Sequence, residues 1–148
     1  MNIKLLVEAL MAAGWQVKHT GSRAICDNPP ENSDDDWVVY QPELNVDEMC
    51  EVLGALGFKT MQQADQVQRQ EDYDPSTTVP MVSADNKVNL IVATSGRTFD
   101  LWSLATDKAR ALGLKSRAER VKLFHEVLYP TLQRPEDDKA EWVQLGGD

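Results

Sequence analysis

The chain has 148 residues and carries 15 Lys and Arg against 24 Asp and Glu, so its formal net charge is −9 at pH 7. This length favours one compact domain, and the acidic balance argues against a general nucleic-acid coat protein, which needs a broad basic face. No apolar run approaches the roughly 18 residues of a membrane span, and Cys26 and Cys50 form neither a disulfide framework nor a CxxC zinc pair, so we expect reduced thiols in a cytoplasmic protein.

The first half of the chain predicts two helices and two strands. Residues 2–13 carry an apolar stripe at helical spacing, and residues 15–20 alternate as a strand does. A loop with Pro29-Pro30 separates this strand from a second one at residues 36–40. Asn45-Val-Asp-Glu48 resembles a capping box and should open the second helix.

The second half predicts a hairpin followed by two helices. Residues 58–61 can begin a short strand, and residues 62–78 are polar enough to form a long loop. Residues 79–83 and 87–94 should pair as a hairpin. A helix over about 98–112 and a second one opened by a capping box at Ser116 follow. Their expected core residues are Phe99, Trp102, Ala105, Ala109 and Leu112 in the first, and Val121, Phe124 and Leu128 in the second.

This order of elements predicts an α+β fold with a small mixed β-sheet, helices mainly on one face of the sheet, and two C-terminal helices. We place the domain at residues 1–133. Residues 134–148 are acidic on balance and are expected to form a loose C-terminal tail.

Charge is distributed unevenly along the chain. No basic residue lies between Arg23 and Lys59, whereas residues 97–129 carry seven bases against four acids. An acidic cluster and a basic segment on one small domain suit a cation together with a polyanionic ligand. The alternative is two solvated faces of opposite sign, and on charge alone we favour that interpretation.

The most informative stretch joins two strands through a glycine turn. The first strand ends at Gly21-Ser22, and an eleven-residue spacer leads to Asp34-Asp35-Asp36, directly before an apolar strand. In an extended chain Asp34 and Asp36 point to the same face, so together they can hold Mg²⁺. Gly21 allows a phosphate to approach the backbone, and the Ser22 hydroxyl can donate to phosphate oxygens. The bland alternative is a solvated acidic turn.

These residues resemble the signature of the DNA polymerase beta-like nucleotidyltransferases: a small Gly-Gly or Gly-Ser turn, a spacer of about ten residues, and Asp-x-Asp leading into a buried strand. Thr20-Gly21-Ser22 and Ser33-Asp34-Asp35-Asp36-Trp37-Val38-Val39 match it in residue type and spacing. The later stretch Val88-Asn89-Leu90-Ile91-Val92 also fits. The resemblance covers residues 1 to about 129, and it is strongest to short single-domain proteins of this kind from bacteriophages.

The resemblance implies transfer of a nucleoside monophosphate from a nucleoside triphosphate to a hydroxyl acceptor. It makes Asp34 and Asp36 ligands of Mg²⁺ (or Mn²⁺) and catalytic residues, and it places Gly21, Ser22 and Arg23 at the triphosphate. Arg23 can equally pair with a local acid. For a phage-encoded protein the implied location is the host cytoplasm.

The chain departs from the family pattern at the third catalytic position, which should carry a carboxylate and is Asn89 instead. An amide oxygen can ligate a metal but cannot act as a base. Asp74, Asp85 or Asp100 can replace the missing carboxylate only if the fold brings one of them close. The alternative function is therefore a catalytically degenerate protein that binds a nucleotide, a nucleic-acid end or a host protein.

Overall fold

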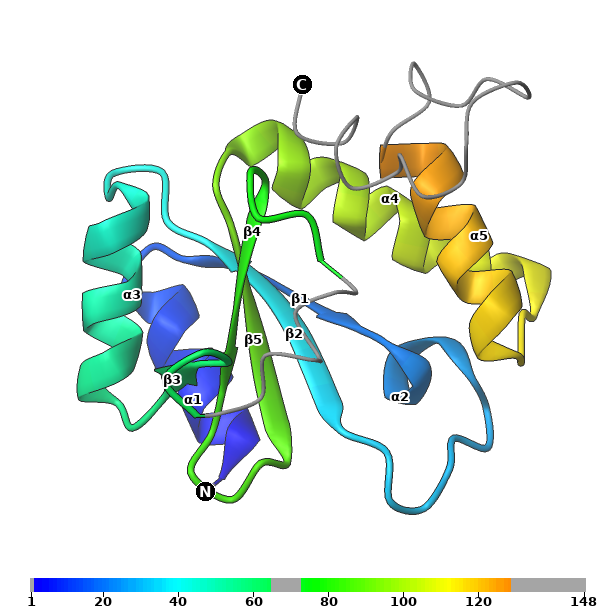
Figure 1. The fold of residues 1–148 in the computed structure, drawn as a ribbon, viewed down its shortest axis with the longest axis horizontal. Helices are drawn as coiled ribbons and strands as arrows, with labels where there is room; N and C mark the ends of the chain where they lie inside the picture. The colour runs from blue at the N-terminus through cyan, green and yellow to red at the C-terminus, as the bar shows by residue number, and fades with distance from the viewer. Residues whose placement is uncertain (1, 65–72, 129–148) are drawn as a thin grey trace.

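A mixed five-stranded sheet forms the centre of the computed structural model, which describes residues 2–64 and 73–128 (Figure 1). The strand order is β1-β2-β5-β4-β3. Strands β2 and β5 are parallel, and every other neighbouring pair is antiparallel. The strands are β1 (Gln16–Thr20), β2 (Asp35–Tyr40), β3 (Lys59–Thr60), β4 (Thr78–Val82) and β5 (Val88–Ala93).

Helices cover both faces of this sheet, with α1 and α3 on one side and α4 on the other (Figure 1). Side chains alternate between the faces, so Val39 and Leu90 pack with the first group while Val38 and Ile91 pack with α4. The helices are α1 (Ile3–Ala12), α2 (Ser22–Ile25), α3 (Val46–Ala55), α4 (Gly96–Leu112) and α5 (Arg117–Leu128).

The predicted α+β class, with a mixed sheet and two C-terminal helices, is confirmed. One detail needs correction, because we expected helices mainly on one face. The reason lies in β5, where all six residues are buried. A strand that is apolar at successive positions is covered on both sides, whereas a half-exposed strand alternates with polar residues.

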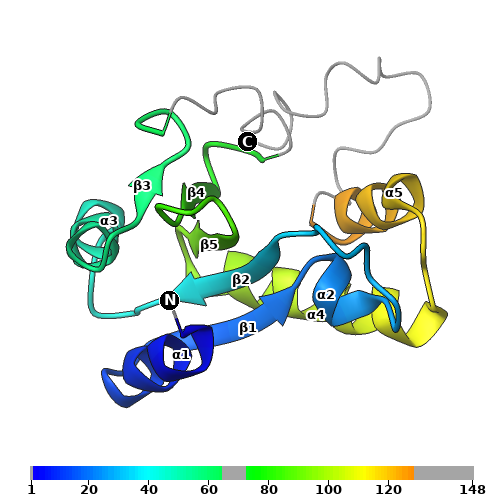
Figure 2. The same cartoon turned by 90° about the horizontal axis from the view of Figure 1, so that it is seen from below.

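A short helix, α2, follows directly after Gly21, where the sequence predicts only a loop. Its Ile25 is buried against Ala109 of α4 and Leu123 of α5. Arg110 Nη1 of α4 donates to the carbonyl of Ala24 at 2.7 Å, which satisfies one of the carbonyls at the end of α2. Figure 2 shows α2 lying beside α4. These contacts hold the Gly21–Ser22 turn against the rest of the domain.

Two of the predicted core residues are exposed. Leu112 is 59% exposed at the last turn of α4, and Val121 is 37% exposed on α5, where Leu123 is buried instead. The apolar residues of α5 do not form a single stripe along the helix. The packing against α2 and α4 therefore decides which of them face inward. The capping boxes of α3 and α5 are both present.

Two predicted segments, the C-terminal tail and part of the long loop, lie outside the described residues. Residues 129–148, which include the expected tail at 134–148, lie outside them, as do residues 65–72 of the expected loop. Among the described helices, none combines the length and the apolar character that crossing a membrane requires.

Candidate functional site

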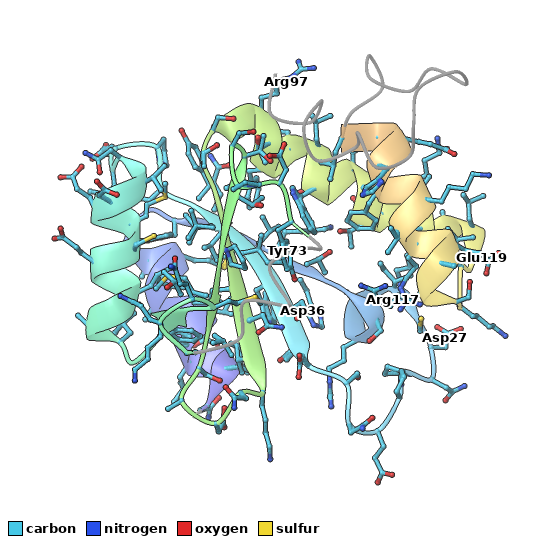
Figure 3. All side chains as sticks on the ribbon, in the orientation of Figure 1. Asp27, Asp36, Tyr73, Arg97, Arg117 and Glu119 are labelled. Atoms are coloured by element: carbon cyan, nitrogen blue, oxygen red, sulfur yellow. The ribbon has the colours of Figure 1, made fainter. Side chains whose placement is uncertain are left out.

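Asp34, Asp36 and Asn89 meet where the parallel strands β2 and β5 begin. The register sets Asp36 directly opposite Asn89. Asn89 Nδ2 donates to Asp36 Oδ1 at 2.7 Å and to Asp34 Oδ2 at 3.3 Å. Figure 3 shows Asp36 on β2, between β5 on one side and α2 on the other. The two carboxylates therefore share one face of the strand, as the period of two predicts, and that face is the one covered by α4.

Asp35, between them, points to the opposite face of the sheet. Its Oδ1 accepts a hydrogen bond from His19 Nε2 at 2.7 Å, and the His19 ring stacks on Trp37 at a centroid distance of 4.3 Å. Burial raises the pKa of Asp35, but the hydrogen bond and charge of His19, together with the contributions of Trp37 and Arg23, outweigh it, so the net pKa lies below the usual value. The acidic triplet is thus divided, and only its outer members join the candidate site.

Gly21 lies directly against the Asp36 carboxylate. A Cβ atom at position 21 would overlap Asp36 Oδ2 and would lie 3.0 Å from the Cβ and Cγ atoms of Asp36. The backbone at Gly21 has φ 75° and ψ −172°, a region that essentially only glycine occupies. Both the close approach and the backbone conformation therefore require glycine here.

A hydrogen-bond chain to α4 supports the strand end that carries Gly21. Thr106 Oγ1 donates to the carbonyl of Trp102 at 2.8 Å, so its single proton is used and Thr20 Oγ1 must be the donor in the 2.7 Å bond between the two hydroxyls. Thr20 pairs with Asp36 across the strands. The period of two predicts that Thr20 shares a face with Asp36, but its partner lies 86 residues away and nothing local in the sequence indicates it.

Ser22 and Arg23 lie in the first turn of α2, immediately after Gly21. The guanidinium of Arg23 donates to two carbonyls of the spacer loop, from Nε to Ser33 at 2.9 Å and from Nη2 to Glu31 at 3.4 Å. The arginine thus binds the backbone that leads into Asp34, a role that neither of its predicted functions included.

The chain has three other carboxylates that could have supplied the missing third acid, Asp74, Asp85 and Asp100. The structure places none of them beside Asp34 and Asp36. Asp85 Oδ1 accepts from Ser83 Oγ at 2.6 Å and from the Lys87 amide at 3.1 Å, which holds it in the β4–β5 turn. Asp74 Oδ1 accepts from the Ser76 amide. Asp74 precedes the start of β4, which pairs with Ala93, so Asp74 lies at the opposite end of β5 from Asn89. Asp100 is exposed on the first turns of α4.

The donor set of the cluster suits a hard divalent cation. Carboxylate and amide oxygens are the ligands that Mg²⁺ prefers. Asn89 is only 2% exposed, and its Oδ1 has no hydrogen-bond partner among the described residues. Within residues 2–64 and 73–128 no group of three or more His, Cys, Asp or Glu side chains is placed to hold a metal ion, so a cation here would rely on two carboxylates and the amide.

Comparisons with known proteins place the chain in no family. No protein-family model, no curated protein and no solved structure matches it.

Proposed function

We propose that this protein binds a nucleoside triphosphate through a divalent cation, Mg²⁺ or Mn²⁺, held by Asp34 and Asp36. The observation that carries the proposal is the convergence of these carboxylates with Asn89 and the Gly21 backbone at one end of the sheet. Two carboxylates balance the charge of one divalent cation, which in turn neutralises part of the triphosphate charge. The resemblance of the Gly-Ser and Asp-x-Asp segments to nucleotidyltransferases supports this choice of ligand.

In this proposal Gly21 lets the phosphates approach the backbone, and Ser22 donates its hydroxyl to a phosphate oxygen. Arg23 joins the phosphates only after releasing the carbonyls of Glu31 and Ser33. The reaction that such a site serves is transfer of a nucleoside monophosphate to a hydroxyl, with release of pyrophosphate. The cytoplasm, which supplies triphosphate and Mg²⁺, is the location we infer for it.

One observation favours binding without efficient transfer. The position opposite Asp36 carries an amide, which cannot take the proton of an attacking hydroxyl. The second candidate function is accordingly a binding protein for a nucleotide, a nucleic-acid end or a host protein. Such a protein would use the site to recognise its ligand and would release no pyrophosphate.

The acidic triplet offers a matched set of variants for testing nucleotide binding. A non-hydrolysable triphosphate with Mg²⁺ is titrated calorimetrically into the wild type, into Asp34→Asn/Asp36→Asn and into Asp35→Asn. We expect binding to be lost in the double variant and kept in Asp35→Asn, because Asp35 faces the other side of the sheet. Equal affinity of the wild type and the double variant would refute the assignment.

Transfer is tested separately from binding. The wild type and Asn89→Asp are incubated with labelled triphosphate, Mg²⁺ or Mn²⁺, and a cell extract that supplies hydroxyl acceptors. We expect weak or no labelling by the wild type, and an increase on the order of 10²-fold in Asn89→Asp, the usual contribution of a general base. Strong labelling by the wild type that Asn89→Asp leaves unchanged or lowers would show that the third position lies elsewhere.

A further inference from the structure

The amide nitrogen of Asn89 lies between the two carboxylates of the cluster. Nδ2 is 2.7 Å from Asp36 Oδ1 and 3.3 Å from Asp34 Oδ2, so both of its N–H bonds are directed at acidic groups. An amide N–H group carries partial positive charge, and it partly offsets the repulsion between two carboxylates. The Asn89 amide therefore reduces the repulsion between Asp34 and Asp36 weakly, and a cation at the same place would reduce it more strongly.

The oxygen of the same amide, Asn89 Oδ1, accepts no hydrogen bond from the described residues. This oxygen is also buried. Such an orphaned acceptor is uncommon in native proteins and requires an explanation. Turning the amide around in the absence of a cation would place three oxygens against one another, so the carboxylates hold it in the observed orientation.

We propose that Asn89 is a switchable ligand of a single divalent cation. Without the cation, Nδ2 bridges Asp34 and Asp36; with it, the amide rotates by half a turn about its Cβ–Cγ bond and Oδ1 becomes the third oxygen ligand. The inference rests on the proposed function, because it requires a cation at Asp34 and Asp36. The inference adds two points to the proposed function: the Nδ2 bridge keeps the two carboxylates together when no cation is bound, and the site holds one cation.

The distances support this exchange. Adjacent oxygens around an octahedral Mg²⁺ ion at 2.0–2.1 Å are about 3 Å apart. The present distances from Nδ2 to the two carboxylate oxygens, 2.7 and 3.3 Å, lie on either side of that value. After rotation Oδ1 would take the position of Nδ2 with little movement of either strand, and Nδ2 would take the buried position that Oδ1 now occupies. The terminal torsion of an asparagine is broad, so the rotation itself meets a low barrier.

The side-chain amide signals of Asn89 report the switch directly, with Mg²⁺ alone as the probe. In a ¹⁵N-labelled sample, the Asn89 pair is assigned as the one that disappears in Asn89→Asp and in Asn89→Leu. We expect Mg²⁺ to shift this pair and to leave the Asn45 pair in place. Asn45 is the internal control because its side chain is engaged in the capping box of α3.

A second measurement uses affinity and stoichiometry. Mn²⁺ titrated into the wild type should bind at one ion per chain. Asn89→Asp should bind it about tenfold more tightly, because ligand charge controls cation affinity in oxygen sites. Asn28→Asp, which adds the same charge on an exposed loop, should leave the affinity unchanged. Without cation, Asn89→Asp should melt at a lower temperature than the wild type, since three carboxylates then face one another.

The outcomes separate this inference from the proposed function. If Mg²⁺ raises the melting temperature of the wild type while the Asn89 signals stay where they were, the cation binds without Asn89 and the switch is refuted, although the proposed function stands. Two Mn²⁺ ions per wild-type chain would also refute it. If neither ion binds with or without triphosphate, the proposed function fails together with the switch.

Discussion

At the residue scale, the site depends on one glycine and one carboxylate that touch. Asp36 uses one oxygen to accept from Asn89 and presents the other to the backbone of Gly21. The β1–β2 pairing, which sets Thr20 opposite Asp36, brings the two residues this close. A substitution at Gly21 therefore acts on the position of Asp36 as well as on the local backbone.

Gly21→Ala should lower the free energy of unfolding by about 3 kcal/mol, because it adds backbone strain and an overlap with Asp36. It should also abolish Mg²⁺-dependent triphosphate binding. Urea denaturation measures the first effect. Gly57→Ala is the matched control, because Gly57 has φ 100° but an added Cβ would meet nothing within 4 Å. A loss at Gly21 no larger than that at Gly57 would show that the contact with Asp36 does not matter.

Much of this arrangement could be predicted from the sequence because it is local. The alternation of residues 34–36 follows from the period of two of a strand, and the resemblance to the nucleotidyltransferase signature indicates that Gly21 lies beside Asp36. Whether a cation and a triphosphate occupy the site stays a prediction. The helix α2 could not be predicted, because its four residues show no periodicity and it is held by Ile25 against two helices far along the chain.

At the element scale, the pairing of β1 with β2 positions the site from both faces. On one face Thr20 bonds to Thr106 of α4, and on the other His19 bonds to Asp35. The second bond involves ionisable groups, so this strand pair responds to pH. The bond adds to the stability of a backbone pairing whose register sets Asp36 opposite Thr20.

The lowered pKa of Asp35 gives the direction of that response. A carboxyl group whose folded-state pKa is below its ordinary value of 3.8 stabilises the fold fully above that pH and loses the contribution as the pH falls through the folded-state pKa. We therefore expect Asp35→Asn to be less stable than the wild type at pH 5–7, with the difference shrinking below about pH 4. Chemical denaturation across this range measures it. A difference that grows on acidification would contradict the assignment.

The capping box of α3 tests a part of the fold that lies away from the site. Asn45 Oδ1 accepts from the Glu48 amide at 2.8 Å, and Glu48 Oε1 accepts from the Asn45 amide at 3.0 Å. Asn45→Ala should cost about 1 kcal/mol in the free energy of unfolding. Triphosphate binding should be unaffected, and a calorimetric titration of the same variant checks this. Loss of binding would mean that α3 is coupled to the site.

At the scale of the whole molecule, the site lies where three separate parts of the chain are brought together. The β1–α2 turn supplies Gly21, β2 supplies Asp36, and β5 supplies Asn89 from more than fifty residues further on. Strand β5 is buried along its whole length and covered on both faces, and β2 pairs with it in parallel. The parallel pairing of β2 with β5 adds Asn89 to the two predicted carboxylates, Asp34 and Asp36, and so completes the cluster.

The most direct test of the central claim is the melting temperature of the wild type with Mg²⁺ and a non-hydrolysable triphosphate together. A ligand that binds only the folded state at about 100 times its Kd adds about 2.7 kcal/mol, which corresponds to a rise of roughly 5–10 °C. We expect that rise with both components, a smaller one with either alone, and none in Asp34→Asn/Asp36→Asn. An unchanged melting temperature in the wild type, or an equal rise in the double variant, would contradict the account.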